Sequence, residues 1–543
     1  MIGRMAPLRS IVAFGLMAVT PVWRQQSEPP VFHAAAHLVQ INVIVRDRDG
    51  HPVGDLTKED FIVKDRGKPQ TISVFSVESA TAASQQQQPL PQNTFSDEAK
   101  YQTGSARSVT IILLDNLNTL SGTAPQPYEN TPYWVEAHAL ANAKQHLLEF
   151  LKHSDPQDRI AIYGLSENLR VLCDFTCDRD QLVSVVNQYD ATSKTRREAA
   201  SPATYHTPVP GPEFNALMNA EVQRLAALTN RARAGLTMAA LGAITDHVIA
   251  LPGRKNLLWL TANLPFSGQA VARVISRANI IAYPVDARGL LPRAPALFTG
   301  EMDADAYAQG KLSTSPAESP QPTGIDAMRE MAEATGGRAF VNSNDLTGAI
   351  RSVIDDSSVT YTLGFYVEAS SLDDKFHELQ VLVKRPGLRL QEPKGYFASG
   401  NTRATEDERN RDFLSAIRSP LDSTAIPLLA RVDRVDQPNP HSLQVSGSVG
   451  IVALQLVQER ERRSGALNVY LIEQDAAGNV LHQTANRMRL DLTEPQYQAY
   501  LRSGIQFRES VQPSANATIL RVIVQDSNSS EIGSVIIPLG QVK

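Results

Sequence analysis

The sequence is poor in cysteine and lacks long apolar runs. It holds only two cysteines among 543 residues, which leaves room for one disulfide at most. Beyond the N-terminal region, no segment reaches the roughly 20 consecutive apolar residues that a transmembrane helix needs. The chain is not basic either: its formal net charge is −5 at pH 7, which argues against a general binder of nucleic acids or anionic membranes.

Catalytic signatures are missing as well. The sequence has no His-Glu-x-x-His motif and no glycine-rich phosphate loop. The stretch GLSEN at 164–168 lacks the second glycine of a nucleophile elbow. The spacing of His138, His146 and His247 along the chain does not match a metal-ligand motif. These absences predict a protein that is not an enzyme.

The N-terminal region is first basic and then apolar. Arg4 and Arg9 precede the apolar stretch 11–19, and no acidic residue comes before Glu28. This order predicts a secretory signal over residues 1–27 and an exported protein that is periplasmic, on the outer surface or secreted. Because the small-x-small cleavage pattern is poor, an uncleaved N-terminal membrane anchor stays open. Lipid attachment there is excluded, since no cysteine lies near this region.

The two cysteines, Cys173 and Cys177, lie close together in LCDFTCD. In an exported chain this spacing permits one small disulfide loop, and the alternative is two unpaired thiols. A metal site is not expected here, because no histidine pair accompanies the cysteines.

Residues 36–78 have the pattern of a small all-β unit. Apolar and polar residues alternate in LVQINVIVRD, and turns rich in glycine and proline separate it from two further strand-like stretches. We therefore expect a small immunoglobulin-like β-sandwich. Residues 79–107 are polar, rich in glutamine and without periodicity, which predicts a flexible linker.

Residues 108–400 alternate between apolar strand-like segments and helix-like segments. Strands that are apolar throughout and separated by helices indicate a mainly parallel sheet with helices on both faces. The expected fold is a Rossmann-type α/β domain. A charged helical connector is expected at 401–425, and a second β-sandwich over 426–543, where period-two runs alternate with polar turns.

One predicted strand ends on a carboxylate. The stretch VTIILLDNLNT at 109–119 runs from apolar residues into Asp115 and then into small polar side chains. In open parallel sheets the functional site lies at the carboxyl ends of the strands. Asp115 therefore marks the edge of the sheet at which we expect a partner to bind.

Several stretches, in their order and spacing, resemble the von Willebrand factor A-related proteins that are abundant in Acidobacteria. These stretches are DRDGHPVGDLTKEDFIVKDRGKPQTISVFS (47–76), LPGRKNLLWLT (251–261), IIAYPVDARGL (280–290), ATGGRAF (334–340) and YTLGFYV (361–367). The resemblance covers most of residues 36–400 and implies a von Willebrand factor A-like central domain. Because members of this family are largely uncharacterised, the resemblance implies a fold more than an activity.

In A domains generally, this edge carries a metal-ion-dependent adhesion site with the first-loop pattern Asp-x-Ser-x-Ser, a threonine and a further aspartate. In this sequence Asp115 and Thr119 fall on first-loop ligand positions, and Thr237 is the candidate second-loop threonine. Leu117 replaces the middle hydroxyl and cannot bind a cation. The implied site is therefore degenerate, and Mg²⁺ or another divalent cation is the only cofactor that it suggests.

The third loop departs from the pattern too, because TANLPF offers Thr261 and Asn263 in place of an aspartate. An alternative needs no ion: Asp115 accepts hydrogen bonds from loop amides and caps the helix that follows. We favour this alternative. Asp286 ends another strand at the same edge, where pairing with Arg288 is expected.

Together these features predict an exported, non-enzymatic protein that binds another protein or a surface polymer through the carboxyl-edge loops of the central domain. One alternative is a structural cell-envelope protein that acts through its β-sandwiches. A second alternative is a metal-assisted hydrolase that uses Asp115 together with Asp286. No nucleic-acid partner is expected, and the sequence leaves the ligand and the oligomeric state open.

Overall fold

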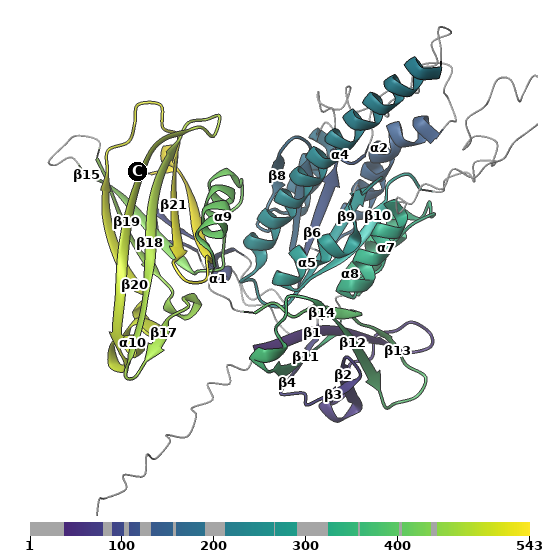
Figure 1. The fold of residues 1–543 in the computed structure, drawn as a ribbon, viewed down its shortest axis with the longest axis horizontal. Coiled ribbons are helices and arrows are strands. Elements are labelled where there is room, and N and C mark those ends of the chain that lie inside the picture. Colours follow the sequence, from purple (N-terminus) through teal and green to yellow (C-terminus); the bar gives the residue numbers. More distant parts are fainter. Residues whose placement is uncertain are drawn as a thin grey trace, which may run out of the picture.

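The computed structural model describes most of the chain between His37 and Val542 (Figure 1). The described ranges are 37–79, 89–102, 108–119, 132–155, 159–189, 212–264, 266–289, 324–356, 359–400, 404–435 and 442–542. The predicted signal at 1–27 lies outside these ranges. Among the described helices, none has both the length and the hydropathy needed to span a bilayer.

A five-stranded sheet forms the central unit, with the strand order β10-β9-β6-β7-β8. Its strands are β6 (Ser108–Asp115), β7 (Arg159–Leu165), β8 (Leu169–Cys173), β9 (Arg254–Thr261) and β10 (Ile280–Asp286). Strands β6, β7, β9 and β10 run parallel, whereas β8 pairs with β7 as an antiparallel hairpin. The predicted mixed α/β fold with a partly parallel sheet is confirmed.

Helices cover both faces of this sheet (Figure 1). One face packs against α4 (Pro212–Val248), α5 (Gly268–Ile275) and α7 (Gly324–Thr335), and the other against α2 (Pro132–Leu151), α3 (Arg179–Gln188) and α8 (Leu346–Asp355). Side chains of β6 alternate between the two cores, with Ile111 and Leu113 in the first and Ile112 and Leu114 in the second. Because both faces are covered, successive residues 111–114 are all apolar rather than alternating with polar ones.

The N-terminal β unit draws on two distant parts of the chain. The first part supplies β1 (His37–Arg46), β2 (Phe61–Asp65), β3 (Lys68–Gln70) and β4 (Val74–Ser79). The second part, which follows the helices of the central unit, supplies β11 (Val359–Val367), β12 (Phe376–Val383), β13 (Arg389–Gln391) and β14 (Gly395–Phe397). These strands form two four-stranded sheets, β13-β1-β11-β4 and β14-β12-β2-β3, that share one core.

The predicted assignment of residues 359–397 to the central domain is therefore wrong, and so is the prediction that residues 36–78 form a separate unit. Residues 36–78 do not close a unit by themselves, because β1 lies inside its sheet and takes β11 and β13 as neighbours. Tyr361 and Phe365, which the sequence pattern assigned to the α/β domain, are fully buried in this core instead. Strand pairing is non-local, so the composition of an apolar stretch such as VTYTLGFYV does not indicate which sheet it joins.

The C-terminal unit also consists of two sheets around a shared core. One contains β5 (Thr94–Ser96), β15 (Leu428–Val435), β16 (Ser442–Val449) and β20 (Ile505–Val511). The other contains β17 (Val457–Glu459), β18 (Arg462–Gln474), β19 (Val480–Thr493), β21 (Ile519–Asp526) and β22 (Ile532–Pro538). The predicted linker 79–107 contributes β5, and Asp97 just after β5 accepts a 2.7 Å hydrogen bond from Leu428 N. This part of the linker is thus built into the C-terminal unit.

The predicted connector 401–425 contains α9 (Glu406–Arg418), which begins after the capping residue Thr405. This helix is more than a spacer, because Ile417 packs against Ile472 and Ile523 of the C-terminal unit. The remaining short helices are α1 (Ala99–Gln102), α10 (Glu494–Ser503) and the 3-10 turns η1 (Lys58–Asp60), η3 (Ser276–Ala278), η5 (Ala369–Ser371), η6 (Ile451–Ala453) and η7 (Leu539–Gln541).

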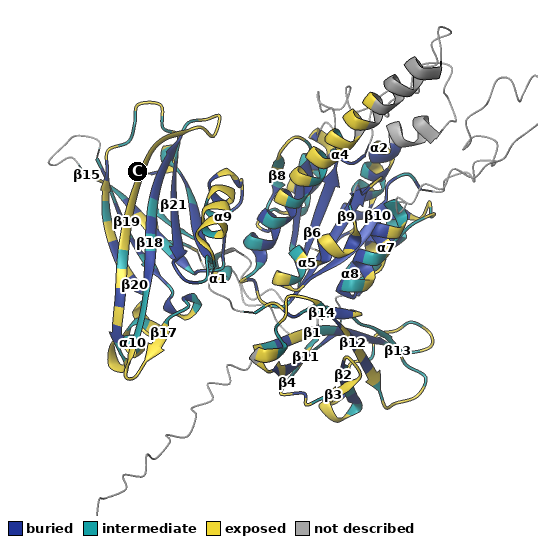
Figure 2. Ribbon diagram, viewed as in Figure 1, coloured by how far each residue is buried: buried dark blue, intermediate teal, exposed yellow. Residues whose placement is uncertain are grey.

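Direct polar contacts join the three units. The buried carboxylate of Asp356 pairs with Arg46 of the N-terminal unit and with Arg338 of the central unit. At the other junction, Thr424 N of the C-terminal unit donates to Asp246 O at the end of α4 over 2.9 Å. Figure 2 shows that buried residues are concentrated on the central strands, while β19 and the outer faces of the helices are exposed.

Candidate functional site

Asp115 is the last residue of β6 and is fully buried at the carboxyl edge of the central sheet. The chain turns there because Asn116 N donates to Leu165 O at the end of β7, over 2.8 Å. The polar residues Asn118 and Thr119, which follow, are buried as well. This edge is therefore a polar layer beneath the surface rather than an exposed loop.

Both carboxylate oxygens of Asp115 accept hydrogen bonds from N–H groups. Oδ1 accepts from Asn118 N at 2.9 Å, and Oδ2 accepts from Asn118 Nδ2 at 2.9 Å. Trp259 of the neighbouring strand β9 donates its indole Nε1–H to Oδ2 over 3.0 Å. A buried indole N–H normally finds an acceptor, and Asp115 provides it here.

The structure brings the predicted residues Asp115, Thr119 and Thr237 to the same edge but links each to a different partner. Asn118 Nδ2 lies 2.9 Å from Thr237 Oγ1, so this amide stands between Thr237 and Asp115. The Thr237 hydroxyl in turn donates to a backbone carbonyl one turn earlier in α4. Thr119 Oγ1 accepts from Ala262 N, just after β9, at 2.9 Å.

These contacts do not fit a divalent cation. A hard cation binds the lone pairs of about six oxygens, whereas the oxygens of Asp115 face three N–H protons. Burial raises the pKa of Asp115, and hydrogen bonds from Asn118, Thr261 and Trp259 offset only part of this rise. The geometry agrees with the alternative in which Asp115 accepts hydrogen bonds from loop amides. The helix-capping part of that alternative lies outside the described residues.

The side chains of Asn118 and Trp259 both donate to Asp115, but neither was among the site residues predicted from the sequence. Asn118 falls between the expected ligand positions of the first loop. Trp259 carried a signal, because its indole N–H in the apolar run LLWLT required a polar partner at the end of a neighbouring strand. Choosing that partner needs the strand order, which only the tertiary structure supplies.

Asp286 ends β10 at the same edge and is buried. Arg288 binds it with Nε 2.8 Å from Oδ1 and Nη2 2.9 Å from Oδ2, so the expected pairing is present. Strand β9 lies between β6 and β10, with Thr261 aligned to Asp286. At a strand spacing of roughly 4.8 Å, the Cα atoms of Asp115 and Asp286 are about 10 Å apart. Arg288 occupies both oxygens of Asp286, and N–H groups occupy those of Asp115, so the two carboxylates are bound separately rather than to a common group.

Cys173 and Cys177 form a disulfide in the structure, with their Cα atoms 6.1 Å apart, which closes a short loop at the end of β8. The loop carries Asp174, whose Oδ2 lies 3.2 Å from Nε2 of the buried His247. His146 lies elsewhere, with its Nδ1 3.0 Å from a threonine hydroxyl of α8. Each of these two histidines thus has its own local partner.

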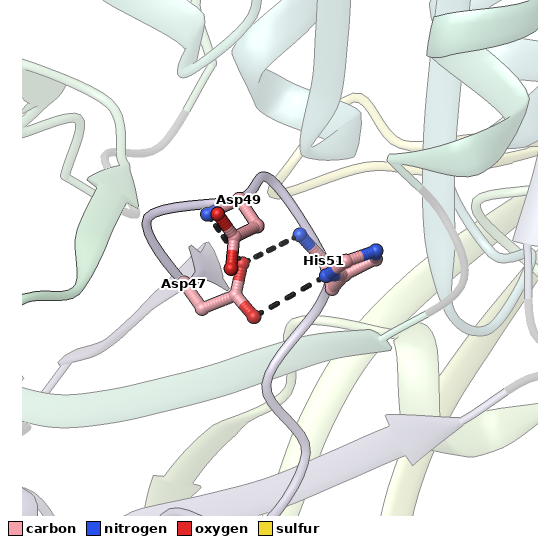
Figure 3. A group of neighbouring side chains, drawn as sticks. All are labelled: Asp47, Asp49 and His51. Carbon is pink, nitrogen blue, oxygen red and sulfur yellow. Dashed lines mark hydrogen bonds and ion pairs between the residues drawn. The ribbon is translucent and has the colours of Figure 1, made fainter.

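A second candidate ion site lies in the turn after β1. The ligand atoms of Asp47, Asp49 and His51 all lie within 4.8 Å of one another (Figure 3). Asp47 Oδ1 accepts from Asp49 N at 2.9 Å and from His51 N at 2.8 Å, while Oδ2 lies 3.4 Å from His51 Nδ1. In such a turn, an aspartate side chain commonly accepts hydrogen bonds from the backbone N–H groups that follow it.

A second turn has the same hydrogen bonds but contains only one acidic residue, Asp475. After β18, Asp475 Oδ1 accepts from Ala477 N at 2.9 Å and from Asn479 N at 2.8 Å. The glycine of each turn has a positive φ. Because Ala477 stands where the first turn has Asp49, turn formation alone explains the cluster around Asp47.

No protein-family model matches the chain, and no curated protein matches it. Similar solved structures include an aerotolerance-related membrane protein from Bacteroides fragilis NCTC 9343, with 11% identity and a TM-score of 0.25 over 46% of this chain and 97% of that chain. Proximal thread matrix protein 1 from the mussel byssus has 9% identity and a TM-score of 0.24, over 46% and 48% of the two chains. A von Willebrand factor type A protein from Catenulispora acidiphila has 12% identity and a TM-score of 0.23, over 60% and 73%. TM-scores this low carry no argument about function.

Proposed function

We propose that this chain is an exported, non-enzymatic protein that mediates protein–protein or cell-surface interactions through the carboxyl-edge loops of its von Willebrand factor A-like central unit. The observation that carries the proposal is the hydrogen-bond network of Asp115. Its carboxylate is fully buried and bound by Asn118 and Trp259, so it stiffens the edge rather than taking part in chemistry. Binding at this edge is then independent of cations, unlike an adhesion site that a metal ion completes.

The surface above this network is polar and exposed. Glu167 and Asn168 form the tip of the β7–β8 hairpin, Asn263 follows β9, and Asn344 precedes α8; all four are exposed. Loops held by a rigid scaffold are a common place for binding sites. These side chains offer hydrogen-bonding groups to a partner, and the buried hydrogen-bond network beneath them keeps their loops in position.

Site-specific photo-crosslinking in the native cells tests this proposal. A photoreactive residue at Asn168 or Asn263 is expected to capture a defined partner, because both positions are exposed at the carboxyl edge. The matched control is the same residue at Arg487, which is exposed on β19. Capture from Arg487 alone would contradict the proposal and favour a role of the C-terminal unit.

Thermal unfolding with a chelator and with Mg²⁺ tests the independence from cations. An ion that binds only the folded protein adds about 2.7 kcal/mol to the free energy of unfolding at a hundredfold excess over its Kd. We expect no Mg²⁺-dependent change in Tm, because N–H groups occupy both oxygens of Asp115. A rise in Tm with Mg²⁺ that the Asp115→Asn variant abolishes would show that the edge binds an ion after all.

One observation favours a structural envelope role as a second candidate. Strand β19 has 14 residues and, among the described strands, pairs only with β18. Its residues 480–487 are all exposed, and an open strand edge is a template for pairing with another chain. If this role holds, Ala485→Lys will prevent the assembly of larger particles in sedimentation experiments. Sedimentation as a monomer by the unmodified protein would remove this candidate.

A further inference from the structure

A groove runs between the N-terminal unit and the amino end of the central sheet. It has a volume of about 340 Å³ and lies between β1 on one side and α5, η3 and the end of β14 on the other. We name it the β1 groove, and its defining residues are Leu38, Gln40, Asn42, Arg273, Phe397 and Ser399. Ile280, the first residue of β10, also lines it, so the groove lies at the opposite end of the sheet from Asp115.

The edge of β1 that faces this groove has no strand beside it. On one side β1 pairs with β11 over His37–Val43, but on the other side β13 covers only Ile44–Arg46. β13 ends two residues before Pro393, which has no N–H to continue the ladder. Within the described part of the chain, residues 37–43 are therefore unpaired along this side.

The hydrogen bonds of β11 show which way the backbone of β1 faces. Gly364 O accepts from Ser73 N at 2.7 Å, so the backbone of Gly364 faces β4. In an antiparallel ladder, successive residues bond to opposite sides. The neighbours Leu363 and Phe365 therefore face β1.

The β1 residues opposite these two neighbours are Ile41 and Val39, which consequently bond to β11. Leu38, Gln40 and Asn42 face the other way, and their backbone N–H and C=O groups point into the groove. None of the three is fully buried. The groove thus offers a row of backbone donors and acceptors to an incoming chain.

The opposite wall supplies a positive charge. Arg273 on α5 is exposed, its guanidinium lies 4.7 Å from the ring centre of Phe397, and its Nη2 donates to Asp374 O over 2.8 Å. Both of these partners are uncharged, so they hold the guanidinium in place without neutralising it. The other arginine of the groove, Arg277, lies 3.4 Å from the carboxylate of Asp246 and is paired.

We propose that the β1 groove binds an extended peptide segment of a partner protein, which adds as a strand to β1 and places an acidic side chain against Arg273. The open stretch accommodates about five residues at about 3.3 Å per residue. Arg277 is already paired with Asp246 and also faces the carboxylate of Glu531. Arg273, whose two contacts are uncharged, therefore supplies the positive charge that favours an acidic side chain on the segment. With β1 on one side and α5, η3 and the end of β14 on the other, the groove has the form of a channel along the open edge of β1, which suits one extended segment.

Panning a phage-displayed library of short random linear peptides against the full chain tests this proposal. Enriched peptides are expected to combine Asp or Glu with β-branched residues. The decisive variant is Gln40→Pro, because it removes one N–H that faces the groove and no bond to β11. The extended residue Val39 before it is compatible with a following proline.

An enriched peptide should bind Gln40→Pro about tenfold more weakly than the wild type, since one backbone hydrogen bond is lost and an acceptor on the peptide is left unpaired. Gln40→Ala is the matched control: it keeps the N–H and should bind like the wild type. Equal binding to Gln40→Pro and the wild type, or no enrichment of any linear peptide, would overturn the proposal.

Arg273→Gln provides a variant that leaves β1 untouched, because Arg273 lies on the exposed side of α5. It should weaken binding of the acidic peptide about tenfold and leave binding of the same peptide with Asn or Gln in place of the acid unchanged. An identical loss for both peptides would overturn the assigned role of Arg273. Substitutions of Asp115 should not alter peptide binding, so this test is independent of the function proposed for the carboxyl edge.

Discussion

The imidazole of His247 joins the central unit to the C-terminal unit. Its Nε2 lies 3.2 Å from Asp174 Oδ2 in the disulfide loop, and its Nδ1 lies 2.8 Å from Asp422 O. Both ring nitrogens therefore face oxygen atoms, which favours the positively charged ring. The Nε2 contact is an ion pair rather than an aligned hydrogen bond.

This arrangement predicts that the stability of the junction depends on pH. Burial alone would lower the pKa of His247, but the nearby charge of Asp174 and the contact with Asp422 O outweigh burial and raise the pKa above 6.5. The folded state thus holds the proton more tightly than the unfolded state. The resulting stabilisation is complete below pH 6.5 and is lost as the pH rises through the raised pKa.

Urea unfolding of the wild type and of His247→Gln from pH 6.5 upward measures this effect. The wild type should lose about 1 kcal/mol more of its unfolding free energy than the variant over this range. Burial raises the pKa of Asp422 to about 6, so Asp422 titrates mainly below the range measured. Parallel pH profiles for the two proteins would show that the pair does not stabilise the fold.

Opening the disulfide should loosen the same junction. Cys173 and Cys177 are 4 positions apart, and the loop-closure entropy of so short a loop corresponds to about 2 kcal/mol of unfolding free energy. The double variant Cys173→Ser/Cys177→Ser should therefore unfold at a lower urea concentration. Its pH profile should also resemble that of His247→Gln, because Asp174 lies inside the loop. If reduction leaves both the stability and the pH profile of the wild type unchanged, the loop does not hold Asp174 in place.

Asp115 and Trp259 should stabilise the carboxyl edge as a pair. Trp259→Phe removes the indole N–H that lies 3.0 Å from Asp115 Oδ2 but keeps an aromatic ring. Asp115→Asn removes the charge and replaces one acceptor oxygen with an N–H donor group. Each variant should lose about 1–2 kcal/mol of unfolding free energy, and a double-mutant cycle should give a coupling of about 1 kcal/mol. Strictly additive losses would contradict the pairing.

Lys255 of β9 is predicted to destabilise the fold at neutral pH. Burial lowers the pKa of Lys255 to about 8, even though the carboxylate of Glu78 raises it in part. Lys255→Met should therefore increase the unfolding free energy at pH 7 by about 2 kcal/mol. The exposed Lys152, changed to Met in the same way, is the matched control and should have little effect.

The pH dependence of Lys255 has the opposite sign to that of His247. Between pH 8 and 10.5 the unfolded lysine keeps a proton that the folded lysine has released, so the stability of the wild type rises with pH in that range. Lys255→Met should lack this rise. An equal rise in both proteins would assign it to another group.

Local patterns were sufficient to predict individual elements of the central unit. The apolar runs RIAIYGL (159–165) and IIAYPVD (280–286) coincide with β7 and β10, because an apolar run between turns is a property of a short window. The helix α8 has a local start signal as well, because Asp345 caps it by accepting from Gly348 N. Periodicity and caps act over a few residues, so they can be read without knowing the rest of the fold.

The sequence by itself determined the alternation of strands and helices in the central unit and placed Asp115 at the end of a buried strand. Only the tertiary structure decided that β11 joins β1 rather than the central sheet, and that Trp259 and Asn118 occupy the oxygens of Asp115. The physical reason is that a strand partner such as β11, and a buried bond such as that from Trp259, depend on contacts between segments more than a hundred positions apart. Their free energies depend on the packing of the whole chain, and no short window of sequence contains them.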